Sequence, residues 1–190
     1  MSEEIHAFDP PSNYNHPAHW HEDFIAHLAW IRHPMIYVEL GIETCRTFNR
    51  IVPFADRLIG VDINLGSGKH MIHSPKTQFI NMETDEFAAL LRKDPIQIDL
   101  LFIDADHSAK AVLRDFKNYF PFVSDQGLII LHDSYPESRG MTRKYSSGTC
   151  YKAIKQMSRI NRNYEIMTLP FSPGLSICRK RSKHIDWDTD

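Results

Sequence analysis

Four short apolar segments, each ending on an acidic residue, constrain the fold of this chain more than any other feature. They are MIYVE (35–39), RLIGVD (57–62), IDLLFID (98–104) and GLIILHD (127–133). A fifth segment, TQFINME (77–83), follows nearly the same pattern. Continuous apolar runs of this length are typical of parallel strands that are buried on both faces of a sheet. The pattern therefore predicts parallel strands that each carry an acidic residue at the same edge of the sheet.

The segments between these strands are long enough for crossover helices. Helix-like sequence occupies 18–31, 48–54, 87–91, 109–120 and 151–160, and two more predicted strands follow at 164–169 and 175–179. This alternation predicts an α/β fold with a Rossmann-like, doubly wound sheet of seven strands, mostly parallel with an antiparallel C-terminal edge pair. We expect a single domain over 18–180, with an N-terminal arm at 1–17 and a polar tail at 181–190.

Composition excludes several kinds of partner. The formal net charge is −2, so no electrostatic attraction to nucleic acid or to an anionic membrane is expected. The three cysteines, Cys45, Cys150 and Cys178, form no CxxC pair, which argues against a zinc site or a disulfide framework. The polar N-terminal sequence is unlike a signal peptide. We therefore expect a cytoplasmic protein that acts on a small molecule, and self-association as a homodimer is left open.

The acidic residues at the strand ends predict a binding site. In an open α/β sheet, ligands bind at the carboxyl ends of the strands, where the strand order reverses. Glu39, Asp62, Asp104 and Asp133 would all face that crevice. Their mutual repulsion must be offset by a cation, a protonated ligand or a metal ion.

The turn after the first strand distinguishes two classes of cofactor. A dinucleotide favours GxGxxG here, whereas this turn reads ELGIETC, with one glycine and with carboxylates at Glu39 and Glu43 that would repel a pyrophosphate. S-adenosylmethionine has no phosphate and carries a sulfonium and an ammonium, so acidic residues suit it. Asp62 follows Glu39 by 23 residues, a spacing that favours hydrogen bonds to ribose hydroxyls.

Five motifs resemble those of the class I S-adenosylmethionine-dependent methyltransferases, and within them the small methyltransferase 24-like O-methyltransferases. The resemblance covers about 37–180, and the motifs are VELGIETCRT (38–47), LIGVDIN (58–64), FINMET (79–84), IDLLFIDADHSAKAVLRDF (98–116), and GLIILHDS (127–134) followed by SSGTCYKAI (146–154). Two positions depart from the family pattern: Cys45 stands where glycine is usual, and Thr47 where serine is common. The resemblance implies S-adenosyl-L-methionine as cofactor, held by Glu39, Gly41, Asp62, Met82, Glu83, Thr84 and Asp104.

The same resemblance implies a metal site. Catechol- and caffeoyl-CoA-type relatives bind a divalent ion through carboxylates at the positions of Asp104 and Asp133, and have an asparagine where this chain has Ser134. Oxygen ligands would favour Mg²⁺ or another hard divalent cation such as Mn²⁺, whereas a contribution from His132 would favour a transition metal. In the alternative, Asp104 binds the ammonium of the cofactor and Asp133 caps the following loop.

Two histidines are the candidate catalytic residues. His107 lies at the position of a catalytic lysine in those relatives, and histidine titrates near neutral pH, so it could deprotonate an acceptor hydroxyl. The alternative is a helix cap or a backbone hydrogen bond. His132 is expected to have a similar role in deprotonating the acceptor. In the alternative, it only orients Asp133. A metal site is also considered for the N-terminal histidines, which are His16, His19, His21, His27 and His33. They are interpreted instead as surface or lid residues, because His19 and His21 are expected on different helix faces and no cysteine joins them.

Together these features predict an enzyme that transfers a methyl group from S-adenosylmethionine to a hydroxyl of a small molecule or sugar. Two alternatives are open. One is an N-methyltransferase that needs no metal. The other is a non-catalytic binding protein of the same fold, which Cys45 in the glycine turn keeps open.

Overall fold

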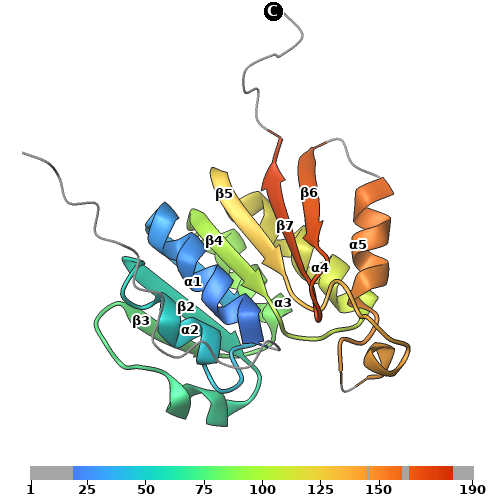
Figure 1. Ribbon diagram of the computed structural model, residues 1–190. Helices are drawn as coiled ribbons and strands as arrows, with labels where there is room; N and C mark the ends of the chain where they lie inside the picture. The colour runs from blue at the N-terminus through green and yellow to red at the C-terminus, as the bar shows by residue number, and fades with distance from the viewer. Residues whose placement is uncertain (1–18, 145, 160–162, 182–190) are drawn as a thin grey trace, which may run out of the picture.

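A single seven-stranded sheet forms the centre of the molecule (Figure 1). The computed structural model describes residues 19–144, 146–159 and 163–181. Within them the sheet has the order β3-β2-β1-β4-β5-β7-β6. The strands are β1 Ile36–Leu40, β2 Arg57–Asp62, β3 Thr77–Asn81, β4 Ile98–Ile103, β5 Val123–Leu131, β6 Tyr164–Leu169 and β7 Leu175–Lys180. The first five are parallel to one another, whereas β7 runs antiparallel to both β5 and β6.

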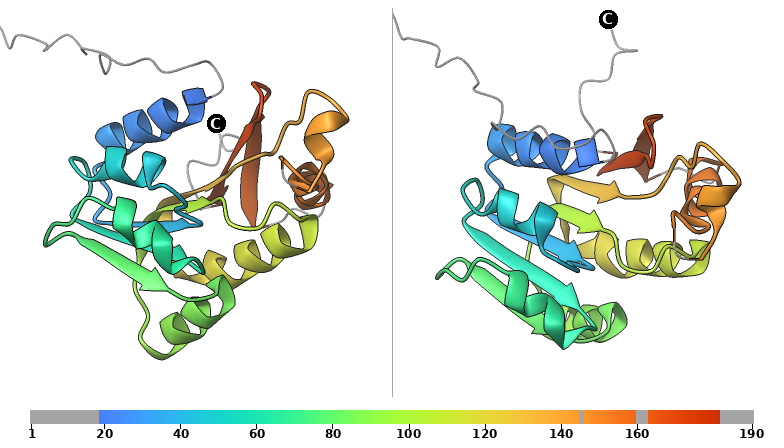
Figure 2. Two further views of the ribbon diagram at one scale, coloured as in Figure 1. Left: turned by 90° about the horizontal axis from the view of Figure 1, so that it is seen from below. Right: turned by 60° about the horizontal axis from the view of Figure 1, so that its bottom comes forward.

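Helices cover both faces of this sheet (Figure 2). The helices are α1 Trp20–Arg32, α2 Arg46–Ile51, α3 Thr84–Lys93, α4 Ala109–Tyr119 and α5 Cys150–Arg159, with short 3₁₀ segments η2 Leu65–His70, η3 Phe120–Phe122 and η4 Gly140–Thr142. Helices α1 and α2 contribute Ile25 and Phe48 to the core on one face. Helices α3, α4 and α5 contribute Phe87, Phe116 and Met157 on the other. This is the three-layer arrangement that buries parallel strands on both sides.

The local sequence explains where these elements begin and end. Ser108 caps α4, since its side chain accepts a hydrogen bond from the amide of Ala111. Helix α3 starts earlier than the predicted 87–91 because Glu83 and Glu86 form a capping box at its N-terminus. Strand β5 starts at Val123 instead of 127, because its first residue pairs with Ile98 before a register shift. The predicted fold class is confirmed, and other boundaries shift by one to three residues, as for α2 at Arg46–Ile51 instead of 48–54.

The strand order places a switch point between β1 and β4. The chain proceeds outward from β1 through β2 to β3 and then crosses to β4 on the other side of β1. Loops leaving β1 and β4 therefore diverge and leave a crevice at their carboxyl ends. The predicted arm (1–17) and all but the first residue of the predicted tail lie outside the described residues, so those domain limits stay predictions. Among the described helices, none is both long and apolar enough to cross a bilayer.

Candidate functional site

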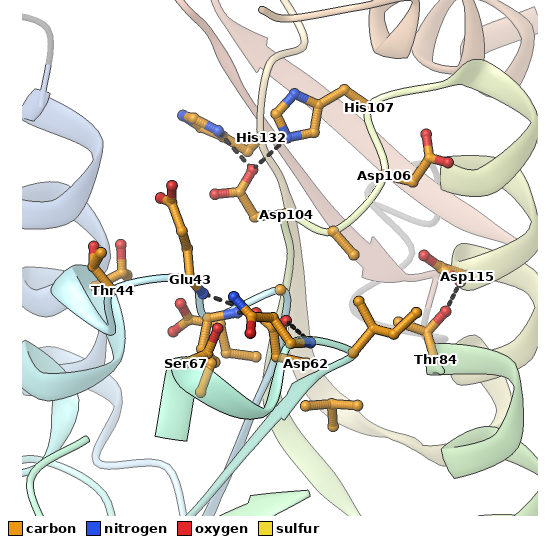
Figure 3. A pocket seen from close by; sticks show the side chains of 18 of the residues that line it. Glu43, Thr44, Asp62, Ser67, Thr84, Asp104, Asp106, His107, Asp115 and His132 are labelled. Atoms are coloured by element: carbon orange, nitrogen blue, oxygen red, sulfur yellow. Dashed lines mark hydrogen bonds and ion pairs between the residues drawn. The ribbon is translucent and has the colours of Figure 1, made fainter. Parts of the chain in front are cut away.

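A cleft of about 960 Å³ lies at the carboxyl ends of the strands (Figure 3). Most of the residues predicted to form a site line it: Glu39, Gly41, Asp62, Met82, Glu83, Thr84, Asp104, His107 and His132. Asp133 is not among the described residues that line the cleft, but it contacts His107 directly. The structure thus brings the predicted cofactor residues and the predicted catalytic residues into one site.

The turn after β1 depends on the glycine at position 41. Gly41 has a φ of 83°, and a Cβ there would lie 2.5 Å from the carbonyl oxygen of Asp104. A side chain at position 41 would therefore collide with the backbone at the end of β4. Cys45 also has a positive φ, 57°, which explains why relatives have glycine there. Its thiol is buried and donates to the carbonyl of Ser67, and Cys45 is absent from the described cleft lining, so it does not block the turn.

Asp62 holds this turn in place. One carboxylate oxygen accepts hydrogen bonds from the amides of Ile42 (3.1 Å) and Glu43 (2.9 Å), and the other accepts from the amide of Asn64 (2.8 Å). A carboxylate has about four acceptor positions, so at least one is left for a ligand hydroxyl. Asp62 therefore connects the two loops that form the floor of the cleft, a structural role that adds to the predicted ribose contact.

Glu39 is a buried carboxylate next to the cleft. The hydroxyl of Tyr37 donates to it at 2.5 Å, and only 3% of Glu39 is exposed. Burial raises the pKa of Glu39 well above its ordinary value, partly offset by the hydrogen bond from Tyr37, and the nearby charge of Asp104 raises it further. A cationic ligand in the cleft would relieve this penalty on the ionised form.

The far end of the cleft is lined by residues that follow β3. Met82, Glu83 and Thr84 are there, as predicted from the family motif. Glu83 also belongs to the capping box of α3. The Thr84 hydroxyl donates to Asp115 of α4 at 2.8 Å, and both side chains are labelled in Figure 3.

The near end of the cleft contains a first aspartate–histidine pair. His132 Nδ1 lies 2.8 Å from Asp104 Oδ1 and 3.7 Å from Asp133 Oδ2. Burial lowers the pKa of His132, but the charge of Asp104 and the hydrogen bond to it outweigh burial, and the net shift is upward. His132 Nε2 is buried and has no hydrogen-bond partner among the described residues. His132 therefore pairs mainly with Asp104 and only at longer distance with Asp133, the residue that it was expected to orient in the alternative to a catalytic role.

A second aspartate–histidine pair lies beside the first. His107 Nδ1 is 2.8 Å from Asp133 Oδ2 and 2.7 Å from the carbonyl oxygen of Ser146. The hydrogen bond to Asp133 raises the pKa of His107 to about 9 against the opposing effect of burial. In this arrangement His107 carries a proton at neutral pH, so it becomes a base only after that proton is displaced. Of the predicted alternatives for His107, the helix cap is wrong because Ser108 caps α4, whereas the backbone hydrogen bond is present at Ser146.

The donor set here fits a divalent ion. One ligand atom each from Asp104, His107 and Asp133 can be chosen so that all lie within 4.8 Å of one another. Asp133 adopts a positive φ of 57°, a conformation that a residue other than glycine or asparagine holds only at a cost. Ser134, at the position of the asparagine of relatives, has a buried hydroxyl with no partner among the described residues. Two carboxylates, an imidazole and a hydroxyl are ligands for Mn²⁺ or a similar ion.

One N-terminal histidine, His21, departs from the predicted surface or lid position, whereas His33 is exposed as predicted. His19 precedes α1, so helical spacing does not separate it from His21, and the two imidazoles lie 6.1 Å apart. His21 is a buried residue, not a surface one, and its ring lies 4.2 Å from that of His132. Burial, followed by the charge of His132, lowers the pKa of His21 to about 3, so this imidazole is neutral. His16 lies outside the described residues.

His19, His21 and Glu22 could together hold a cation, but the negative charge of Glu22 is already neutralised. Ligand atoms of the three residues lie within 4.8 Å of one another. However, the Glu22 carboxylate is 2.9 Å from Arg46 and 3.5 Å from Arg50, so two guanidinium groups hold the place of a metal. This group forms one wall of the cleft next to the two aspartate–histidine pairs.

Sequence reasoning missed several residues of the site. Tyr37 could have been found, because residues two apart on a strand share a face and Tyr37 therefore accompanies Glu39. His21, Asp115 and Ser146 could not, since their roles depend on how distant segments pack.

Comparison with known proteins gives a family match. The sequence model of the methyltransferase 24 family, described as a methyltransferase domain, matches residues 4–134. The chain is also 28% identical over 131 residues to an uncharacterized protein of Acanthamoeba polyphaga mimivirus. That match covers 60% of this chain and 59% of the viral protein, so the chain spans less than two thirds of this relative's length.

Solved structures share the fold at low sequence identity. The methyltransferase PaMTH1 of Podospora anserina, bound to S-adenosylhomocysteine, is similar with a TM-score of 0.69 and 15% identity over 85% of this chain and 78% of that one. An O-methyltransferase of Bacillus cereus in complex with S-adenosylhomocysteine has a TM-score of 0.71 and 11% identity, covering 90% and 84%. The O-methyltransferase TomG of Streptomyces achromogenes, in complex with S-adenosylmethionine, has a TM-score of 0.69 and 9% identity, covering 85% and 80%.

Proposed function

Because this chain belongs to the methyltransferase 24 family, we propose that it transfers the methyl group of S-adenosylmethionine to a hydroxyl of a small molecule or sugar. One observation carries the proposal: the residues predicted to hold the cofactor line one cleft with the Asp104–His132 pair and with His107, which pairs with Asp133. O-methyltransferases bound to S-adenosylmethionine or its product have the same fold, which supports this choice of cofactor and reaction.

The charges of the cleft give the cofactor an orientation. Glu39 and Asp104 would face the ammonium and sulfonium of the methionine part, since their carboxylates need positive charge nearby. Asp62 would accept hydrogen bonds from the ribose, and Met82 and Thr84 would contact the adenine. This places the methyl group near Asp104 and therefore near both histidines.

Methyl transfer then requires an acceptor oxygen in line with the methyl group and without its proton. His132 is held by Asp104 through Nδ1, which leaves its unpartnered Nε2 to take a proton. His107 can relay a proton to Asp133, its partner at 2.8 Å. We propose that Asp104 and Asp133, with His107 or Ser134, hold a divalent ion. Such an ion, when bound, lowers the pKa of the acceptor hydroxyl.

A metal-independent N-methyltransferase is the second candidate. The observation that favours it is that Asp104 and Asp133 each already have an imidazole partner at 2.8 Å, which balances their charges. A nitrogen acceptor would then need only a proton acceptor such as His132. The third alternative, a non-catalytic binder, loses its support because Cys45 adopts the backbone conformation of the turn and does not enter the cleft.

The cellular setting is also a proposal. Cys45, Cys150 and Cys178 are all buried free thiols, which favours the reducing cytoplasm. A small-molecule acceptor suits the cleft volume of about 960 Å³, part of which the cofactor would fill. A homodimer stays a prediction.

The test has two stages. Calorimetry with S-adenosylhomocysteine should show binding, and its absence would contradict the proposal. Transfer from methyl-labelled S-adenosylmethionine is then measured on a panel of catechols, sugars and amines, after chelation and after restoring Mg²⁺ or Mn²⁺. Labelling of a hydroxyl acceptor that disappears with chelator supports the metal-assisted O-methyltransferase. Labelling of amines that is unaffected by chelator supports the second candidate.

A further inference from the structure

We propose that Asp115 is a positioning residue that turns the Thr84 hydroxyl into an obligatory hydrogen-bond acceptor, so that the cleft selects a purine with a 6-amino group. The inference rests on the proposed function, because it concerns the adenine end of the same cleft. It adds a residue of α4 to a site otherwise formed by loops after strands.

The hydroxyl proton of Thr84 has a fixed destination. Thr84 Oγ1 donates to Asp115 Oδ1 at 2.8 Å, and Asp115 is fully buried. Tyr119 donates its own hydroxyl to the Thr84 carbonyl at 2.7 Å, which fixes the backbone of the same residue. A hydroxyl has one proton and two lone pairs. With the proton committed to Asp115, only lone pairs remain for a ligand.

A carboxylate is the side chain that enforces this direction. Asparagine has nearly the same shape and would avoid burying a charge, but its amide can also donate, which would release the threonine proton toward the cleft. Asp115 Oδ2 is buried and has no hydrogen-bond partner among the described residues, so the charge is poorly compensated. Its nearest cation, Arg114, is 3.8 Å from Asp115 but 3.1 Å from Asp85. A buried carboxylate with so little charge compensation lowers the stability of the fold. Its presence at position 115 therefore indicates a function beyond packing.

The position of the pair within the cleft identifies what it would recognise. Thr84 and Asp115 both border the cleft, at the end away from Asp104 and beyond Asp62 (Figure 3). A cofactor with its sulfonium at Asp104 and its ribose at Asp62 would place its purine there. Adenine presents an amino donor at position 6, whereas hypoxanthine presents an oxygen that an acceptor-only site repels. Sites with fixed polar groups discriminate strongly at such positions.

The experiment compares two ligands that differ at this edge of the purine. Calorimetry measures the affinities of S-adenosylhomocysteine and S-inosylhomocysteine for the wild type and for Thr84→Val, Asp115→Leu and the double variant, all nearly isosteric. We expect the wild type to favour the adenosine compound by roughly 10- to 100-fold. Each single variant should lose most of this ratio. The double variant should lose no more than either single variant, because both changes disrupt the same hydrogen-bonded pair. Any part of the affinity ratio that arises at purine N1 is the same in the wild type and in all variants. It therefore does not affect the comparison between them.

Controls separate recognition from folding and from general electrostatics. Thr84→Ser retains the hydroxyl and should retain the ratio, and Asp115→Asn should reduce it without a change of shape. Asp85→Asn removes a neighbouring carboxylate outside the cleft lining and should leave the ratio unchanged. Equal binding of the two ligands to the wild type would overturn the inference and leave the proposed function intact, as would an unchanged ratio in Asp115→Leu. Failure of the wild type to bind either ligand would instead contradict the proposed function, and the inference with it.

Discussion

The two halves of the cleft hold their carboxylates in different ways. In the cofactor half, Asp62 is bound by three backbone amides and Glu39 by the hydroxyl of Tyr37. In the acceptor half, Asp104 and Asp133 are bound by the imidazoles of His132 and His107. Amides and a tyrosine hydroxyl keep their protons at physiological pH, whereas imidazoles exchange them. The first half is thus built to bind, and the second is able to move protons.

The halves also differ in how far along the chain their partners lie. Glu39 finds its partner Tyr37 on the same strand. Asp62 finds its partners at Asn64 and in the turn at Ile42 and Glu43, 20 and 19 residues earlier. The acceptor half depends on distant pairs: His107 with the carbonyl of Ser146, and His21 against His132. Gly148 permits part of this approach, because a Cβ there would lie 2.7 Å from the His107 carbonyl. Changes remote in sequence should therefore disturb the acceptor half more than the cofactor half.

The largest expected effect is on metal binding in the acceptor half. Asp133→Asn removes a charge but retains a residue that tolerates a positive φ, so the backbone should be preserved. We expect Mn²⁺ affinity, measured by electron paramagnetic resonance with S-adenosylhomocysteine present, to fall about 100-fold or more. Asp125→Asn, on an exposed part of β5, should leave it unchanged. Equal affinities for wild type and Asp133→Asn would mean that this pair of carboxylates is not a metal site.

The second-largest expected effect is on ligand binding in the cofactor half. Asp62→Ala should weaken S-adenosylhomocysteine binding by roughly 1.5–3 kcal/mol, as expected for lost charge-assisted hydrogen bonds. Because Asp62 also holds the turn, the melting temperature of the apoprotein should decrease as well. Calorimetry and thermal melts measure the two effects, with Asp56→Ala, just before the same strand, as control. Unchanged ligand affinity would place the ribose elsewhere.

The fold was predictable because β1, β2, β4 and β5 each contain a short apolar run, such as LLFI in β4. Buried strands such as β1 and β4 need apolar residues on both faces, and this requirement is visible in the sequence. The capping box at Glu83 and Glu86 was also visible, yet the predicted helix started three residues late, at Phe87, because apolar content alone was used to place it. Boundaries set by hydrogen bonds are thus less apparent than those set by hydrophobicity.

The site was predictable only for those functional residues that lie directly at the end of a strand. Glu39, Asp62, Asp104 and Asp133 follow strands, so topology alone places them together. The partners of these carboxylates were not predictable, since pairing His132 with Asp104 and not with Asp133 depends on side-chain geometry. His21 was assigned to the surface because the start of α1, and hence the relation between His19 and His21, could not be fixed from sequence.

A third test concerns the exception within the binding half, Asp115, whose carboxylate has no backbone donor among the described residues. Burial raises its pKa from the ordinary 3.8 to about 6, despite the hydrogen bond from Thr84 and the charge of Arg114, while Asp85 and Asp106 raise it further. A raised folded-state pKa gives stability that is fully present below pH 3.8 and is lost as pH rises through 6.

Asp115→Leu should therefore stabilise the protein at pH 7.5 and lose this advantage near pH 4. The pKa difference corresponds to roughly 3 kcal/mol, and the lost hydrogen bond to Thr84 offsets about 1, so we expect a gain of about 2 kcal/mol at pH 7.5. Urea unfolding at both pH values measures it, with Asp125→Leu, whose side chain is 87% exposed, as a control that should show little change. A gain independent of pH would mean that burial of apolar area, and not removal of a charge, is the cause.

The smallest expected effect concerns the turn that joins the two halves, where Cys45 replaces the glycine of relatives at a φ of 57°. Glycine is normally less stabilising than alanine by about 1 kcal/mol in a helix, but a Cβ in the left-handed region costs about as much or more. Cys45→Gly should thus be equal to Cys45→Ala or more stable by up to about 1 kcal/mol in urea unfolding, since both lack the thiol. The same pair at Ser158, an exposed position in α5, should show the ordinary order with alanine more stable. If alanine is clearly favoured at both positions, the turn does not impose the left-handed conformation at position 45.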